Sequence, residues 1–433
     1  MSRVMTMGSL LVLWAVVLGP VHANTASNEP AVMASALAPF LPAEAVAREA
    51  LLASPGIQAA RARKAAGLAR AQGIDSGTAE FVVRSSAQRR RDTTTGVPLH
   101  ESMVSIERPV RSWGKRGIDA DLAEQTQTLA QIEYADALHE SARELMRLWF
   151  AHLRALADQK NAVTTLELAT KMQRLTQVQL KHGEVSRLDA DLARAELERI
   201  TAAKAVADAQ LASASAALGQ RYPGLSLPTR WPEATQLSGA QRLPALDEPM
   251  ALMRQAYLDK NHELNLLRAD AQRLRLIAER VSRDRWPDPT VGVFSGRERA
   301  GAETLTGVSV SIPFPGGYRR HQATAALAEA QAASDKVQLA EQQLGALFEG
   351  LWLHYHHKRT AADNLRAAAQ RQAVAADKSV KAYSLGEGSL SDVLLIARMA
   401  SDNLNAAERM QLDMLELLAL IQLDLHRIWD FDD

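Results

Sequence analysis

The stretch Lys115–Lys181 has the sequence KRGIDADLAEQTQTLAQIEYADALHESARELMRLWFAHLRALADQKNAVTTLELATKMQRLTQVQLK, and after Gly117 it lacks glycine and proline until Gly183. At a rise of ~1.5 Å per residue, one helix over this stretch spans roughly 100 Å. Helices of globular domains usually have only ~10–14 residues. Apolar residues recur at three- and four-residue steps, as at Leu145 and Leu148. The pattern predicts a coiled-coil arm or the wall of an elongated structure.

A second stretch, Tyr318–Leu385, also lacks proline and predicts a second long helix. Each long helix follows a β-like phrase that ends in proline, and each is followed by a Gly-Glu turn. The matching prolines, basic residues and turns of the two halves lie about 200 residues apart, which indicates an internal duplication. A further helix is expected before each pair of strands, and after each turn the chain returns as a helix, Leu188–Leu218 and Leu390–Trp429.

The composition excludes several classes of protein. The chain has 50 basic and 50 acidic residues and no net charge, whereas a nucleic-acid partner calls for a basic excess. It has no cysteine, which excludes disulfides, thiol catalysis, thiolate metal sites and a lipidated cysteine.

The N-terminus is typical of an export signal. Arg3 precedes the apolar run Leu10–Leu18, and Val21-His22-Ala23 suits signal peptidase. The alternative is an uncleaved anchor, but the run is shorter than the ~20 residues of a spanning helix.

Each half also contains a predicted hairpin of β-strands. Val308 and Val310 alternate with Ser309 and Ser311, and the first half repeats this pattern around Val104 and Ile106. Strands of about ten residues suit a tilted membrane barrel, with the valines towards lipid and the serines towards the lumen. An ordinary half-buried hairpin on a soluble domain is the alternative.

Four strands cannot close a barrel, so membrane strands would require an oligomer. Aromatic residues gather between strand and helix like an interfacial belt: Trp113, Trp286, Phe314 and Tyr318. Prolines bound the strands there, and the predicted junction comprises Pro109, Trp113, Pro313 and Pro315.

These elements divide the chain into eight parts. They are a signal peptide (1–23), a leader and helix (24–78), barrel hairpin 1 (79–112), long helical hairpin 1 (113–220), a connector (221–249), the helix of repeat 2 (250–287), barrel hairpin 2 (288–315) and long helical hairpin 2 (316–433).

No catalytic, cofactor or metal site is predicted. The sequence has no nucleophile elbow, phosphate loop or Rossmann fingerprint. His354 and His357 share a helical face, but no carboxylate stands at matching spacing, so a polar helix face is the preferred interpretation. An enzyme is therefore not expected.

With its two repeats, paired strands, proline junctions and long helices, the sequence resembles the TolC family of outer-membrane efflux ducts. The most specific phrases are the turns 183–189 and 383–394. The phrase from Arg108-Pro109 to Trp113-Gly114-Lys115-Arg116 is most similar to the CzcC-type branch, which serves heavy-metal efflux. The fold class implied is mainly α with a membrane β-barrel contribution, built from a duplicated unit of strand hairpin plus long coiled-coil helices into a trimeric tube.

The resemblance also implies location and partners. A homotrimer would form a twelve-stranded barrel in the lipid of the outer membrane of a Gram-negative bacterium and a tube in the periplasm. The tube would meet a periplasmic adaptor and an inner-membrane pump, commonly of the resistance-nodulation-division type. The candidate cargo is heavy-metal cations, drugs or a secreted polypeptide, and the sequence does not choose among them. No nucleic-acid partner is implied. A periplasmic coiled-coil scaffold or adaptor without a pore is the alternative function.

The resemblance assigns roles to the turns. The entrance gate would comprise Asp392, Asp189 and Tyr383, with Asp189 binding across to Tyr383. The adaptor-contacting residues would be Gly183, Glu184, Ser186, Gly386, Glu387 and Ser389. Each aspartate also follows a serine by three residues, so helix capping is an alternative role. Gly388 and Leu395 depart from the family pattern, because a basic residue and a second aspartate ring can stand there.

Overall fold

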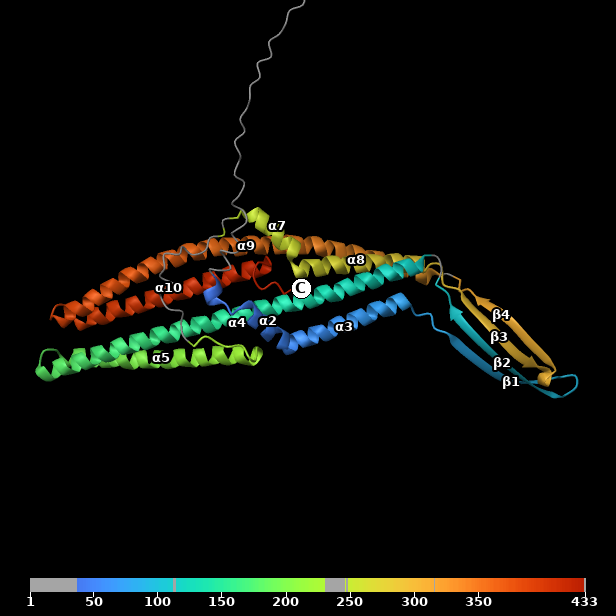
Figure 1. Cartoon of the computed structure of the whole chain (residues 1–433), viewed down its shortest axis with the longest axis horizontal. Helices are drawn as coiled ribbons and strands as arrows, with labels where there is room; N and C mark the ends of the chain where they lie inside the picture. Colours follow the sequence, from blue (N-terminus) through green and yellow to red (C-terminus); the bar gives the residue numbers. More distant parts are fainter. Residues whose placement is uncertain (1–36, 112–113, 230–245, 247, 315, 432–433) are drawn as a thin grey trace, which may run out of the picture.

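The computed structural model describes residues 37–111, 114–229, 246, 248–314 and 316–431. The molecule is elongated, with long helices side by side and one sheet at the end of the helical body (Figure 1). The predicted signal peptide, Trp113 and Pro315 lie outside the described residues. Within the described part of the chain, no helix combines the length and the apolar character needed to cross a membrane.

The helices repeat in matched pairs. The two long helices, α4 (Lys115–His182) and α9 (Gly317–Ser384), have 68 residues each. The returning helices α5 (Arg187–Arg221) and α10 (Leu390–Asp424) have 35 each. Before the strands, α3 (Pro55–Ser76) and α8 (His262–Arg283) have 22 each, preceded by α2 (Glu44–Ala53) and α7 (Met250–Lys260). These equal lengths support the predicted duplication, and η1 (Ala38–Phe40) precedes the first set.

Each half has two short helices separated by a capped break. The Ser54 side chain accepts a hydrogen bond from the Ile57 amide, and Pro55 takes the first helical position, where its missing N–H costs nothing. In the second half, Asn261 caps α8 by accepting from the Leu264 amide. The two helix starts are therefore capped by different side chains, each of which accepts a hydrogen bond from a backbone amide of the first turn.

Four antiparallel strands form one sheet in the order β1-β2-β3-β4. They are β1 (Val82–Arg91), β2 (Pro98–Pro109), β3 (Thr290–Glu298) and β4 (Glu303–Ser311), with η2 (Arg299–Gly301) between the last two. β1 pairs with β2 and β3 with β4, as the two predicted hairpins require. β2 also pairs with β3, so the two halves share one sheet.

The register separates two faces of this sheet. One face carries a row of β-branched residues directly opposite one another across the strands: Val83, Ile106, Val293 and Val308. The opposite face carries a row that includes Glu107, Gly292 and Ser309, and Glu107 binds Arg84 there at 2.8 Å. Val293 and Val308 stay 56% and 76% exposed, so none of the described segments covers the apolar face.

The main core lies in the helical body, away from the sheet. Long side chains of four helices pack there, among them Phe150 of α4, Met253 of α7, Phe348 of α9 and Leu418 of α10. Helices from both halves of the duplication therefore pack into one core.

The last long helix ends earlier than the sequence predicts. α10 stops at Asp424, and Trp429, predicted as its end, has a positive φ of 50°. Apolar periodicity continues past the end because Ile428 and Trp429 still pack into the core.

Candidate functional site

The first turn, between α4 and α5, is stabilised at both helix ends. Gly183 has φ 75°, and the amides of Gly183 and Glu184 donate to the carbonyls of Leu180 (3.1 Å) and Gln179 (2.9 Å). This pair of bonds is the Schellman motif, which favours glycine at the left-handed position. On the far side, Ser186 and Asp189 form a complete capping box, because the Asp189 amide donates to the Ser186 hydroxyl oxygen and the Asp189 carboxylate accepts from the Ser186 amide.

The second turn, between α9 and α10, repeats this arrangement with one difference. Gly386 has φ 83°, and the amides of Gly386 and Glu387 make the same two bonds. Ser389 caps α10 through the Asp392 amide at 3.1 Å, and Asp392 accepts from the Ser389 hydroxyl at 2.8 Å. Asp392 is exposed, whereas Asp189 is partly buried. The Asp392 carboxylate therefore takes less part in capping its helix than the Asp189 carboxylate does.

Tyr383 anchors the turns to each other. Its hydroxyl donates to Gln179 Oε1 at 3.1 Å, and its ring packs in a small cluster with Met172, Leu390 and Val393. Within one chain, Tyr383 therefore binds α4 rather than Asp189. A bond from Asp189 to the tyrosine of a neighbouring chain stays a prediction.

The predicted adaptor-contacting residues are all at the surface of the tip. Gly183, Glu184 and Ser186 are exposed in the first turn, and Gly386, Glu387 and Ser389 in the second. The two turns lie at the end of the molecule away from the sheet (Figure 1). Exposure is consistent with a docking role, which remains a prediction.

A groove of about 590 Å³ runs between the two helical hairpins near the tip. Asn161 of α4 spans towards α10, where it donates to Asn405 at 2.7 Å and to Glu408. Burial is the main cause of the raised pKa of Glu408, and the Asn161 bond partly opposes it. The groove is therefore polar along this wall.

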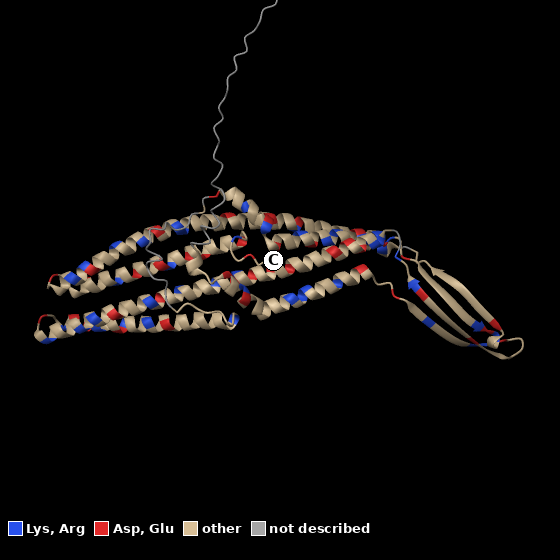
Figure 2. Ribbon diagram, viewed as in Figure 1, with Lys and Arg blue, Asp and Glu red and all other residues tan. Residues whose placement is uncertain are grey.

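A charged network joins helices to strands at the other end of the body, where Figure 2 shows basic and acidic residues together. Lys115, the first residue of α4, is 1% exposed. Its ammonium group lies 2.9 Å from the carboxylates of both Asp284 and Asp288, and donates to the Trp286 carbonyl at 2.7 Å. The network fixes the end of α8 against the start of α4.

Of the predicted junction residues, Pro109 closes β2 opposite Thr290, and Pro313 follows β4. The aromatic residues Trp286, Phe314 and Tyr318 are 70%, 96% and 76% exposed. Large exposed rings beside an uncovered apolar sheet are typical of a membrane interface.

The histidines considered from the sequence, His354 and His357, are both exposed on α9. Sequence reasoning missed a different group, in which His139, His262 and His426 come together. These residues lie on three elements far apart in the chain, so no local spacing signals them.

Comparisons with known proteins place the fold. No family model matches the chain. The outer-membrane channel OprN superimposes with a TM-score of 0.73 at 18% identity, covering 89% of this chain and 90% of that channel. The outer membrane protein VceC of Vibrio cholerae gives a TM-score of 0.69 at 17% identity, covering 88% and 95%.

The chain has the fold of the TolC-family outer-membrane channels. The predicted fold class is thus confirmed, and channels with the TolC fold assemble as trimers. In sequence, the chain is similar to the cobalt-zinc-cadmium resistance protein CzcC of Cupriavidus metallidurans, with 24% identity over 215 residues. That match covers 49% of this chain and spans about half the length of CzcC.

Proposed function

We propose that this chain is the outer-membrane exit duct of a tripartite efflux system, a passive channel through the outer membrane and periplasm of a Gram-negative bacterium. One observation carries the proposal. A sheet with an apolar face, a polar face and two edge strands is continuous with helices of 68 residues. Neither a scaffold nor an enzyme needs such a sheet.

The edges of the sheet support a trimer. Within the described chain, β1 and β4 each pair on one side only, and an open edge cannot face lipid. Three copies supply twelve strands, an even number that suits a closed barrel. The valine row would face lipid, and the Glu107 side would face the lumen.

The resemblance to the TolC family suggests the partners. A periplasmic adaptor would contact the exposed turns at the tip, and an inner-membrane pump, of the resistance-nodulation-division type, would supply the energy. The similarity to a cobalt-zinc-cadmium resistance protein supports heavy-metal cations as the cargo. From the resemblance of the two turns to those of the TolC family, we assign the entrance gate to Asp392, Asp189 and Tyr383.

Membrane fractionation tests the duct. Outer-membrane fractions run on a gel without boiling should show a trimer band, and boiling should convert it to monomer. A soluble periplasmic monomer would favour a scaffold and overturn the proposal.

Replacing Asp392 by asparagine tests the entrance. Three carboxylates around a narrow mouth should attract cations, because low-dielectric walls concentrate their field. Asparagine can still accept from Ser389. We therefore expect Asp392→Asn to lower cation selectivity and cation block in planar-bilayer recordings while the trimer melts at its usual temperature.

Ser389→Ala is the matched control. It removes the cap of α10 and should cost ~1 kcal/mol of stability, while the carboxylate and the selectivity remain. If Asp392→Asn shifts only the melting temperature, Asp392 caps its helix and does not gate.

A further inference from the structure

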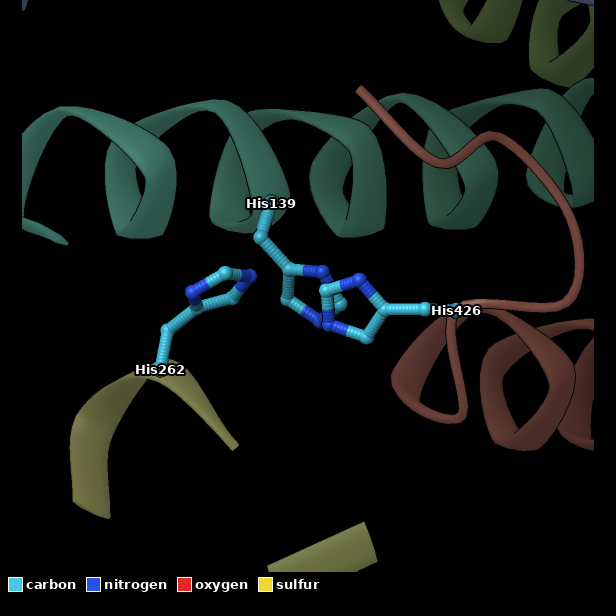
Figure 3. Close-up of side chains that lie close together, drawn as sticks. All are labelled: His139, His262 and His426. Carbon is cyan, nitrogen blue, oxygen red and sulfur yellow. The ribbon is translucent and has the colours of Figure 1, made fainter. Parts of the chain in front are cut away.

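Three imidazole rings converge in the helical body, each from a different element (Figure 3). His139 lies on α4, His262 begins α8, and His426 follows the end of α10. One ligand nitrogen from each lies within 4.8 Å of the others, and the ring centroids are 4.9 to 5.4 Å apart. The side chains of His139 and His426 are only 13% and 8% exposed.

Two of these rings also contact carboxylates. His139 Nε2 lies 3.1 Å from Asp424 Oδ1, and His426 Nδ1 lies 3.2 Å from Asp430 Oδ1. A metal-binding histidine commonly donates its second ring N–H to a carboxylate, which fixes the ring and its tautomer. The second oxygen of Asp424 is buried without a hydrogen bond. The cluster therefore has the outer partners of a metal site and a spare oxygen beside it.

The surrounding charge is compatible with a cation. Asp136 interacts electrostatically with His139 and with the carboxylates of Glu140 and Glu263. The basic groups nearby are already engaged: Arg143 binds Asp424, and Lys260 donates to the Leu425 carbonyl at 3.2 Å.

The backbone of His426 gives an independent signal. The amides of His426 and Arg427 donate to the carbonyls of Leu423 and Gln422, which makes the end of α10 a third Schellman motif. The other two have glycine at the left-handed position, Gly183 and Gly386. His426 takes that position with φ 54°, where a side chain is strained. At this left-handed position the third Schellman motif therefore has histidine, whereas the other two have glycine.

The duplication supplies an internal comparison. Because the paired helices have equal lengths, each histidine has a counterpart in the other half. The offset of 203 residues between Gly183 and Gly386 makes Gln342 the counterpart of His139 and Pro223 that of His426, and the matched helix starts pair His262 with Pro55. None of these three counterparts is a histidine, so the architecture shared by the two halves does not require the imidazoles.

We propose that His139, His262 and His426 bind a divalent transition-metal cation of the zinc class and thereby tie the end of α10 to α4 and α8. Neutral imidazoles suit zinc, cobalt, nickel and copper, and three of them leave a fourth position for water or Asp424. Nitrogens bound to one zinc ion at ~2.0–2.1 Å lie about 3.4 Å apart, so small side-chain rotations complete the site. The proposal does not depend on what the duct carries.

The test uses the full-length protein in detergent, stripped with chelator and titrated with zinc chloride alone. We expect one zinc ion per chain by calorimetry and a rise in melting temperature that magnesium does not reproduce. Cobalt(II) should give the visible absorption of a site with nitrogen ligands. Absence of a saturable zinc response in the unaltered protein would overturn the proposal.

His426→Gly separates metal binding from packing. Glycine relieves the left-handed strain, so the metal-free variant should melt at or above the temperature of the metal-free parent and lose the zinc shift. His262→Gln, at a helix start, should also lose the shift. The double variant His354→Ala, His357→Ala is the matched control and should keep it. An unchanged zinc shift in His426→Gly or His262→Gln would overturn the site.

Discussion

Val308→Arg is expected to deplete the trimer from the outer membrane. Val308 lies near the middle of β4, opposite Val293 in the apolar row, and 76% of it is exposed. An arginine facing lipid at mid-bilayer costs ~2–4 kcal/mol, and a trimer bears that cost three times. The amount of heat-sensitive trimer in outer-membrane fractions measures the effect.

Ser309→Arg is the matched control, one residue away on the opposite face. Ser309 lies beside Gly292 and near Glu107, whose carboxylate can pair with the new guanidinium. Trimer levels should therefore stay close to those of the parent. Equal loss in both variants would show that the valine face does not meet lipid.

The long helices were predictable because their signals are local. The sequence predicts one helix over Lys115–Lys181, and α4 spans Lys115–His182. The prediction holds because no glycine or proline interrupts the stretch between Gly117 and Gly183. The two hairpins were also predictable, because apolar and polar residues alternate along their strands. The pairing of β2 with β3 joins residues far apart in the chain. It was not predictable, because no pattern within either strand indicates which strand it pairs with.

The sites divide in the same way. The capping of Asp189 and Asp392 follows from a serine three residues before each, and the structure shows both caps. The histidine cluster has no such signal, because three distant segments must fold before the rings meet. The end of α10 was misplaced for a related reason: its left-handed residue is His426, and glycine is the usual marker.

Lys115 illustrates a further limit, since its position at a helix start predicts an ordinary solvated lysine. The structure buries it to 1% exposure between Asp284 and Asp288, at the junction of helices and sheet. Removing one partner of a buried charge network leaves the others uncompensated. Arg280 still contacts Asp284, so Asp288 would bear most of the loss.

We therefore expect Lys115→Met to destabilise the folded protein by ~3–5 kcal/mol, measured by denaturant unfolding of the detergent-solubilised protein. Arg116→Met, at the next and exposed position, should change stability by less than ~0.5 kcal/mol. Adding Asp288→Asn to Lys115→Met should recover part of the loss, because it removes a negative charge that Lys115 no longer offsets. Equal unfolding of the Lys115 and Arg116 variants would mean that the network does not hold the sheet to the helices. Partial recovery in the double variant would identify unpaired charge, rather than lost packing, as the source of the instability.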